Sequence, residues 1–235
     1  MAFGDKVQSK AALEDVDVSS IAVTLDGAVG SGNLLVATVA SRGSGATIAI
    51  TDWNSFGAVD PPSHQQRAFW LAADDLASLT VTASITAANE MAMTVVEYEG
   101  PFDFDALLNT SNNAHSGTVS VASQTTGEVT TTVDDCLLVG MVAVIDVTGT
   151  LGSWSDSFLA DDTGGPTSHS TDVTVAQGHL AVAATGAYSS SFSWTNARRA
   201  SGIIGAFAAG SGSVFDPDNF QASVLDDDVT LTWDA

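Results

Sequence analysis

The chain has 235 residues, 45% of them hydrophobic, and its 28 acidic against 6 basic residues give a net charge of −22. This apolar content can fill a sizeable core and argues against disorder of the main body. The charge disfavours binding to nucleic acid, because phosphate backbones repel such a surface. Residues 1–6 lack the apolar region of a secretory signal, and no stretch reaches the length of a membrane span. We therefore expect a protein made in a cytoplasm, with neither a membrane nor a nucleic acid as its partner.

The N-terminal part predicts a polar arm followed by strands. Residues 1–15 form the arm, with Phe3 as its single aromatic residue and one short helical turn at Lys10–Glu14. Alternation of apolar and polar residues then begins and predicts a strand at Asp17–Leu25. Asn33–Ala40 is an apolar run of strand length between glycine-rich turns, so we expect a strand that is buried on both faces.

The rest of the first half predicts further short strands and one loop. Asn54–His64 contains Gly57, Pro61 and Pro62, and we expect it to be a loop that displays Phe56. Alternating or apolar runs predict the strands on either side of it. These strands are Ala46–Trp53, Arg67–Ala72, Leu79–Ile85 and Met91–Glu99.

A second pass through the same pattern follows. The run Cys136–Val144 resembles Asn33–Ala40 and is the clearest sign of an internal repeat. Five further pairs of segments are predicted to correspond between the two passes. The predicted pairs are Thr118–Val121 with Ile21–Val23, Leu151–Trp154 with Ile48–Trp53, His169–Val175 with His64–Leu71, His179–Ala184 with Leu79–Ile85, and Gly202–Ala208 with Met93–Glu99.

Short strands at regular spacing, with turns between them, predict an all-β fold: an antiparallel, jelly-roll-like β-sandwich with an internal pseudo-repeat. We expect residues 16–213 to form this sandwich from two related passes, 16–100 and 117–210, whose strands interleave around one core. Two separate domains are the alternative. The tail, residues 214–235, predicts two more strands joined by an acidic turn.

Nothing in the sequence resembles a catalytic centre, and we expect no enzyme activity and no cofactor. Cys136 is the only cysteine and lies in an apolar run, which favours a buried, inert thiol. His64 and His169 hold matching places in the two passes and could bind a metal together. Two exposed loop histidines are the preferred interpretation, and no metal is predicted. Carboxylate pairs such as Asp161-Asp162 could hold calcium, but solvated turns are the default.

Aromatic residues raise the question of carbohydrate binding, because sugars stack on exposed rings. For the tryptophans we favour core packing, since large aromatic side chains dominate core burial. The better candidates for exposed rings that contact a glycan are Phe56 and Phe158. The tryptophans are Trp53, Trp70, Trp154, Trp194 and Trp233.

Residues 30–210 resemble a β-sandwich domain that recurs in virion proteins of tailed phages and in some bacterial surface proteins. Four segments carry the resemblance, and they are Asn33–Val36, Ile50–Trp53, Thr94–Gly100 and Leu137–Val139. The resemblance implies a structural protein of the virion, made in the host cytoplasm, such as a capsid decoration, a head fibre or a tail component. The alternative is a carbohydrate-binding or adhesion module on a phage or bacterial surface, for which a host glycan would be a partner. An enzyme such as a glycan depolymerase ranks third.

The tail resembles the first two strands of a fibronectin type III domain, through Pro217, Phe220 and the Val229–Trp233 pattern. A lone two-stranded hairpin is marginally stable in water, so we expect it to pair with another surface. We therefore predict a homo-oligomer, preferably a trimer, whose ends contact neighbouring copies or other virion proteins. The candidate assembly contacts are Phe3, Phe215, Phe220, Leu231 and Trp233.

Overall fold

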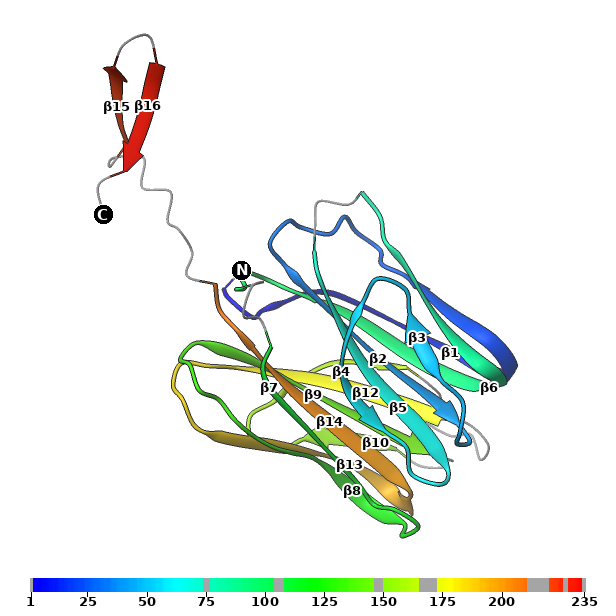
Figure 1. Ribbon diagram of the computed structural model, residues 1–235. Helices are drawn as coiled ribbons and strands as arrows, with labels where there is room; N and C mark the ends of the chain where they lie inside the picture. Colours follow the sequence, from blue (N-terminus) through cyan, green and yellow to red (C-terminus); the bar gives the residue numbers. More distant parts are fainter. Residues whose placement is uncertain are drawn as a thin grey trace.

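The predicted all-β, antiparallel β-sandwich architecture is confirmed by the computed structural model, in which the described elements are strands with antiparallel partners (Figure 1). No helix in the part of the chain that the structure describes is long and apolar enough to cross a membrane. The described residues are 2–73, 77–103, 108–145, 150–164, 173–210, 220–225 and 228–233.

The first pass builds a β-sandwich of its own from β1 (Lys6–Thr24), β2 (Leu34–Arg42), β3 (Ile48–Ile50), β4 (Asn54–Val59), β5 (His64–Ala72) and β6 (Thr80–Tyr98). Its sheet order is β1-β6-β2-β5-β4, with β3 on β6. The last part of β6 pairs with β2 and with the start of β1, whereas its first part pairs with β3 and with the end of β1. Side chains from both parts share one core, so the long strands fold over and serve two layers.

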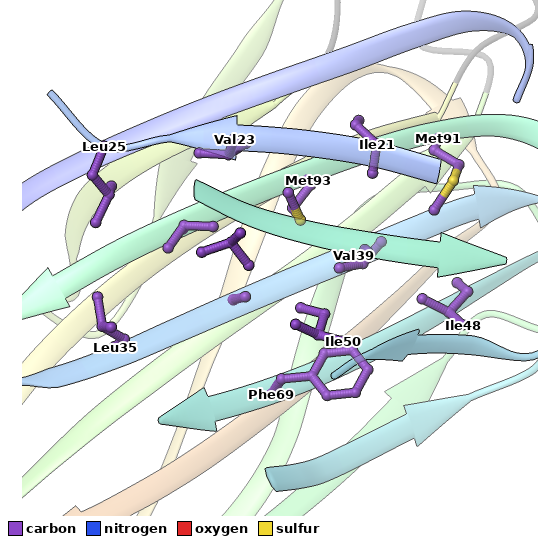
Figure 2. Packing of buried hydrophobic residues seen from close by; sticks show 14 of the residues in the cluster. Ile21, Val23, Leu25, Leu35, Val39, Ile48, Ile50, Phe69, Met91 and Met93 are labelled. Carbon is purple, nitrogen blue, oxygen red and sulfur yellow. The ribbon is translucent and has the colours of Figure 1, made fainter. Parts of the chain in front are cut away.

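That first core is drawn in Figure 2. Ile21 and Val23 on β1 face Leu35 and Val39 on β2, and all four are at most 2% exposed. Two of the three register shifts in the β1–β6 ladder fall between Glu14 and Ser20, where the strands pass from one layer to the other. Bulges increase the local twist and bend a strand, which suits such a corner.

The second pass builds the equivalent sandwich from separate strands, and it begins with β7, earlier than the predicted start at residue 117. One sheet has the order β11-β12-β9-β14-β7 and the other has β10-β13-β8. Buried residues such as Leu138, Phe192 and Ile204 fill the space between them. The strands are β7 (Leu108–His115), β8 (Val121–Thr130), β9 (Cys136–Ile145), β10 (Leu151–Trp154), β11 (Leu159–Gly164), β12 (Val173–Val182), β13 (Ala187–Arg198) and β14 (Ala200–Ala208).

The two passes share one topology, which is that of a jelly roll with one strand moved between its sheets. The moved strand is β4 in the first pass and β11 in the second, and each lies at the edge of the larger sheet. The long strand β1 of the first pass corresponds to two strands of the second pass, β7 and β8. In the same way, β6 corresponds to β13 and β14. Leu34 lies opposite Ala72 and Tyr98, just as Leu137 lies opposite Ala181 and Phe207. The internal pseudo-repeat therefore extends to the pairing register of the central strands.

The register corrects three of the predicted correspondences. Leu25 N donates to Leu79 O just as Thr131 N donates to Gly186 O, so the counterpart of Val23 is Val129 on β8 and not the segment Thr118–Val121. His64 lies opposite Arg42 on β2, and Val173 holds that place opposite Ile145 on β9, so His169 is not the counterpart of His64. His169 itself lies outside the described residues. His179 belongs to β12, and the counterpart of the Leu79–Ile85 segment is β13. The prediction failed because the start of β13 is rich in serine and lacks the apolar alternation of the first pass.

The strands of the two passes do not interleave, because every described sheet is built from one pass only. Instead the two large sheets pack face to face, and a further apolar layer lies between them (Figure 1). Alternate residues of each central strand serve the two layers. Leu35 and Leu138 point into their own sandwiches, whereas Leu34 and Leu137 both belong to the apolar layer between the two sandwiches.

Other segments differ from the sequence-based expectations. Residues 6–15, expected in a polar arm with a helical turn, lie in β1, where they pair with the buried end of β6. The expected loop Asn54–His64 contains β4, an edge strand with a register shift beside Gly57. Glycine and proline in a short segment favour a loop prediction, but an edge strand tolerates a bulge. The two predicted tail strands are present as β15 (Phe220–Leu225) and β16 (Asp228–Trp233), which pair with each other.

Two of the segments that carry the family resemblance meet at Glu97. This carboxylate is fully buried and accepts hydrogen bonds from Gly30 N at 2.8 Å, Asn33 Nδ2 at 2.7 Å and Gln8 Nε2 at 2.6 Å. Asn33 Oδ1 in turn accepts a bond from Gly100 N at 3.0 Å. Hydrogen bonds to a charged acceptor offset the cost of burying it. The Asn33 and Glu97 motifs therefore form one structural lock between β1, β2 and β6.

The change Glu97→Gln is expected to lower the free energy of unfolding by about 1–3 kcal/mol, because it removes the charge and sets an amide N–H₂ against donors. Chemical denaturation monitored by tryptophan fluorescence measures this loss. Glu99→Gln is the matched control two residues along, and it should leave stability nearly unchanged because Glu99 is only partly buried. Equal effects at both positions would contradict the proposed lock.

Candidate functional site

Fully buried polar side chains lie on the facing large sheets, where the two sandwiches meet. Buried polar groups require hydrogen-bond partners, and these side chains find them in one another. They form two clusters, one around Ser201 and one around Tyr98. The members with no exposed surface include Thr38, His64, Gln66, Thr94, Tyr98, Gln177 and Ser201.

The first cluster joins β5 of one sandwich to β14 of the other. Ser201 Oγ donates to Gln66 Oε1 at 2.7 Å and lies 2.8 Å from His64 Nε2. The other imidazole nitrogen, Nδ1, lies 3.1 Å from Ser63 Oγ. Gln66 Nε2 donates to Thr38 Oγ1 at 3.3 Å. A hydroxyl, an imidazole and a carboxamide thus lie in direct contact.

His64 is buried, not exposed on a loop as expected. Its pKa is lowered from 6.5 to about 4, first by burial and then by the positive charge of Arg199 and the neighbouring His115, with Asp60 opposing the shift. The imidazole is therefore neutral at pH 7, and a neutral imidazole can accept a proton. His64 begins β5, a strand of apolar and amide residues that leads into the core.

The second cluster joins β6 to β11 and β12. Tyr98 Oη donates to Asp161 Oδ2 at 2.6 Å and accepts a bond from Gln177 Nε2 at 3.0 Å. Asp161 Oδ1 lies 2.6 Å from His179 Nδ1, and Thr94 Oγ1 donates to Gln177 Oε1 at 3.0 Å. Burial and the adjacent Asp161 carboxylate raise the pKa of Tyr98 well above 10, so its hydroxyl stays protonated.

The expected glycan contacts, Phe56 and Phe158, are wrong, because both rings are buried, at 8% and 6% exposure. Phe56 packs edge-on against Phe207 with ring centroids 5.2 Å apart, and Phe158 stacks on Trp154 at 6.0 Å. Glycines on neighbouring strands leave the space that these rings occupy. A Cβ at Gly205 would lie only 2.6 Å from the Phe56 ring. Facing glycines and aromatic residues are distant in sequence, so no local pattern reveals the fit.

Core packing is confirmed for the four tryptophans whose side chains the structure describes. Trp194 is 4% exposed, and Trp53, Trp70 and Trp154 are partly buried against the core clusters. The side chain of Trp233 lies outside the described residues. Cys136 is buried as predicted, and burial raises the pKa of its thiol, with Asp135 and Asp134 adding to the shift. A raised pKa keeps the thiolate scarce and the thiol inert.

The candidate carboxylates do not converge. Asp161 is buried in the Tyr98 cluster, whereas Asp162 points elsewhere and accepts a bond from Thr163 N. Asp134 accepts a bond from Thr185 N. Within the described residues, no group of three or more histidine, cysteine, aspartate or glutamate side chains could hold a metal ion.

The candidate assembly contact that the structure describes in full is Phe3. Its ring is half-buried against Phe102 with centroids 5.0 Å apart. Phe3 also lines a shallow depression of about 220 Å³ with Pro101, Asp135, Ala209 and Gly210. Both ends of the sandwich region therefore meet at this depression. Phe215 lies outside the described residues, and Phe220, Leu231 and Trp233 belong to β15 and β16.

Comparisons with known proteins do not place the chain in a family. No protein-family model matches it, and no curated protein matches it. One solved structure that matches is the crystal structure of the STIV MCP, with 9% identity over 91% of this chain and 98% of that chain. The TM-score is 0.26, and a match at this score carries no conclusion about fold or role.

Proposed function

We propose that the chain is a structural protein of a tailed-phage virion, acting by protein–protein assembly as a capsid decoration, a head fibre or a tail component. The observation that carries this proposal is the Glu97 lock. It ties two of the four segments that resemble phage virion sandwiches into one structural unit. The buried clusters also favour a structural role, because their reactive side chains are withdrawn from any solute.

The partners in this proposal are copies of the chain and other virion proteins, and the protein resides in the virion after synthesis in the host cytoplasm. A net charge of −22 makes copies repel one another except where their contacts are uncharged or screened. The apolar residues of the tail offer such contacts, whereas the Phe3 depression also includes the acidic side chain of Asp135. The pairing of β15 with β16 sets Phe220 opposite Trp233 and Ala222 opposite Leu231, at positions that alternate with polar ones.

The tail is expected to carry assembly. Deleting residues 214–235 should convert a homo-oligomer, preferably a trimer, into a monomer, because two strands alone cannot bury their apolar residues. Light scattering measures the mass, and cosedimentation with virus particles measures attachment. The paired change Phe220→Ser with Trp233→Ser should act like the deletion. Gln221→Ser with Thr232→Ser, at the next pair in the register, is the matched control.

A truncated chain that assembles and attaches like the full chain would overturn this role of the tail. Adhesion to a glycan is the rival function, but the two rings expected to contact the glycan are buried, so no observation favours it.

A further inference from the structure

All four arginines of the chain lie towards one end of the interface between the two sandwiches. Arg42 is the last residue of β2 and lies opposite His64, the first residue of β5. Arg67 follows three residues further along β5. Arg198 ends β13, and Arg199 comes directly before β14. We call this set of four residues the arginine end.

The arginine end carries more positive charge than its ion pairs neutralise. Arg67 Nη1 and Nη2 donate to Asp60 Oδ1 and Oδ2 at 2.7 and 3.0 Å. Arg42 Nη1 lies 3.6 Å from Glu90 Oε2. Among the residues that the structure describes, no carboxylate lies within ion-pair distance of the Arg199 guanidinium. Two carboxylates are thus paired at a place where four guanidinium groups gather.

The buried imidazole of His64 reports the sign of the electric field at this end. Burial lowers the pKa of His64 to about 4, the charges of Arg199 and His115 lower it further, and Asp60 opposes them with the smallest effect. Positive groups therefore outweigh the nearest carboxylate, although the whole chain has a net charge of −22. A local field of this sign attracts acidic groups.

The tail is acidic at its turn, and it leaves the sandwiches from their opposite end. Strand β14 begins beside Arg199 and ends at Ala208, from which the chain leads towards the tail. At about 3.3 Å per residue, the nine residues of β14 span ~30 Å. The sequence joins β15 to β16 through Asp226–Asp228. The apolar pair Phe220 and Trp233 lies at the other end of this hairpin.

We propose that the arginine end receives the acidic turn Asp226–Asp228 from a second copy of the chain, so that copies join head to tail. This inference rests on the proposed assembly through the tail and names the surface on which the tail docks. A contact within one chain would require the tail to turn back along the whole of β14, whereas a second copy placed end to end meets the arginines directly. Guanidinium groups pair with carboxylates through parallel hydrogen bonds, which makes this contact specific.

The two surfaces in this contact differ, which limits the assemblies that it can build. A contact between unlike surfaces closes into a ring if the rotation between copies allows it, and otherwise continues as a filament. A ring of three copies accommodates the expected trimer.

Light scattering on the full chain tests the proposal through reversed charges. Arg199→Glu and Asp227→Arg should each raise the concentration at which the oligomer dissociates by about tenfold or more, because each sets like charges against one another. Lys10→Glu is the matched control. It makes the same change of charge at an exposed lysine that pairs with Asp26, and it should assemble like the wild type.

Mixing the two variants distinguishes a second copy from a contact within one chain. In the mixture, the acidic turn of the Arg199→Glu chain meets an intact arginine end, and the two reversed charges meet each other at the next contact. Assembly should therefore return, which also shows that both variants are folded. A mixture that stays dissociated, while one chain with both changes assembles, overturns the role of the second copy. A monomeric wild type overturns the proposal outright.

Deleting residues 214–235 keeps this inference separate from the proposed function. A monomeric deletion variant, together with an Arg199→Glu chain that assembles like the wild type, would mean that the tail carries assembly but docks elsewhere. Only the present inference would then fail. A loss of assembly in Arg199→Glu but not in Asp227→Arg would assign the arginines to another acidic surface and would also overturn it. If the deletion variant itself assembled normally, the role of the tail and its docking at the arginines would both be wrong.

Discussion

Replacing Leu35 by alanine is expected to lower the free energy of unfolding by about 2–5 kcal/mol, and Leu138→Ala by a similar amount. Both side chains are fully buried on the central strand of their sandwich, β2 and β9 respectively. Each packs into the interior that its own pass encloses. The loss combines the missing apolar contacts with the cavity that the neighbouring strands cannot fill. Equilibrium denaturation in urea measures it.

Leu159→Ala is the matched control, because the same atoms are removed from a side chain that is 62% exposed on β11. Its effect should stay within about 0.5 kcal/mol, as is usual for surface substitutions. Losses below roughly 1 kcal/mol at both Leu35 and Leu138 would contradict the two-core arrangement. If only one substitution were costly, the sandwiches would contribute unequally to the stability of the chain.

The central strands could be predicted from sequence because they are buried on both faces and read as continuous apolar runs. Asn33–Ala40 and Cys136–Val144 match β2 and β9 closely. Their similarity also predicted the repeat. The sequence pattern could not predict whether the protein has one core or two. A strand that is buried on both faces has the same composition whether the strands packed against it come from one pass or from both.

The edge and outer strands were harder to predict. Strands β4 and β11 carry glycine, aspartate and serine, and β13 begins with Ala-Tyr-Ser-Ser-Ser, so their local composition favours loops. Pairing with a neighbour distant in sequence fixes them as strands, and this tertiary contact overrides local propensity. The correspondence assigned to His179 failed for the same reason, since the serine-rich start of β13 does not resemble its counterpart, Leu79–Ile85.

The buried polar clusters were beyond sequence reasoning. Ser201 and His64 are 137 positions apart, and only the packing of the two large sheets brings them together. A lone histidine next to Pro61, Pro62 and Ser63 is more typical of a turn. Asp161 stood next to Asp162 as one of many acidic pairs, and nothing nearby in sequence distinguishes the buried member from the solvated one.

Lowering the pH from 7 to 4 is expected to cost the protein about 3 kcal/mol of stability through His64 alone, at about 1.4 kcal/mol per unit of pKa shift. The folded-state pKa is about 4 and the unfolded value is 6.5, so the unfolded chain binds the proton more readily. This contribution is fully present above pH 6.5. It is lost progressively as the pH falls from 6.5 towards 4, because protonation then favours the unfolded state. Urea denaturation at successive pH values measures the slope.

The change His64→Gln isolates this contribution from the carboxylates, which titrate in both proteins. Glutamine can still bond to Ser201 but has no proton to gain, so the difference in stability between wild type and variant should shrink steadily below pH 6.5. Parallel curves for wild type and His64→Gln between pH 7 and 4 would mean that His64 is charged, or open to water, in the folded protein.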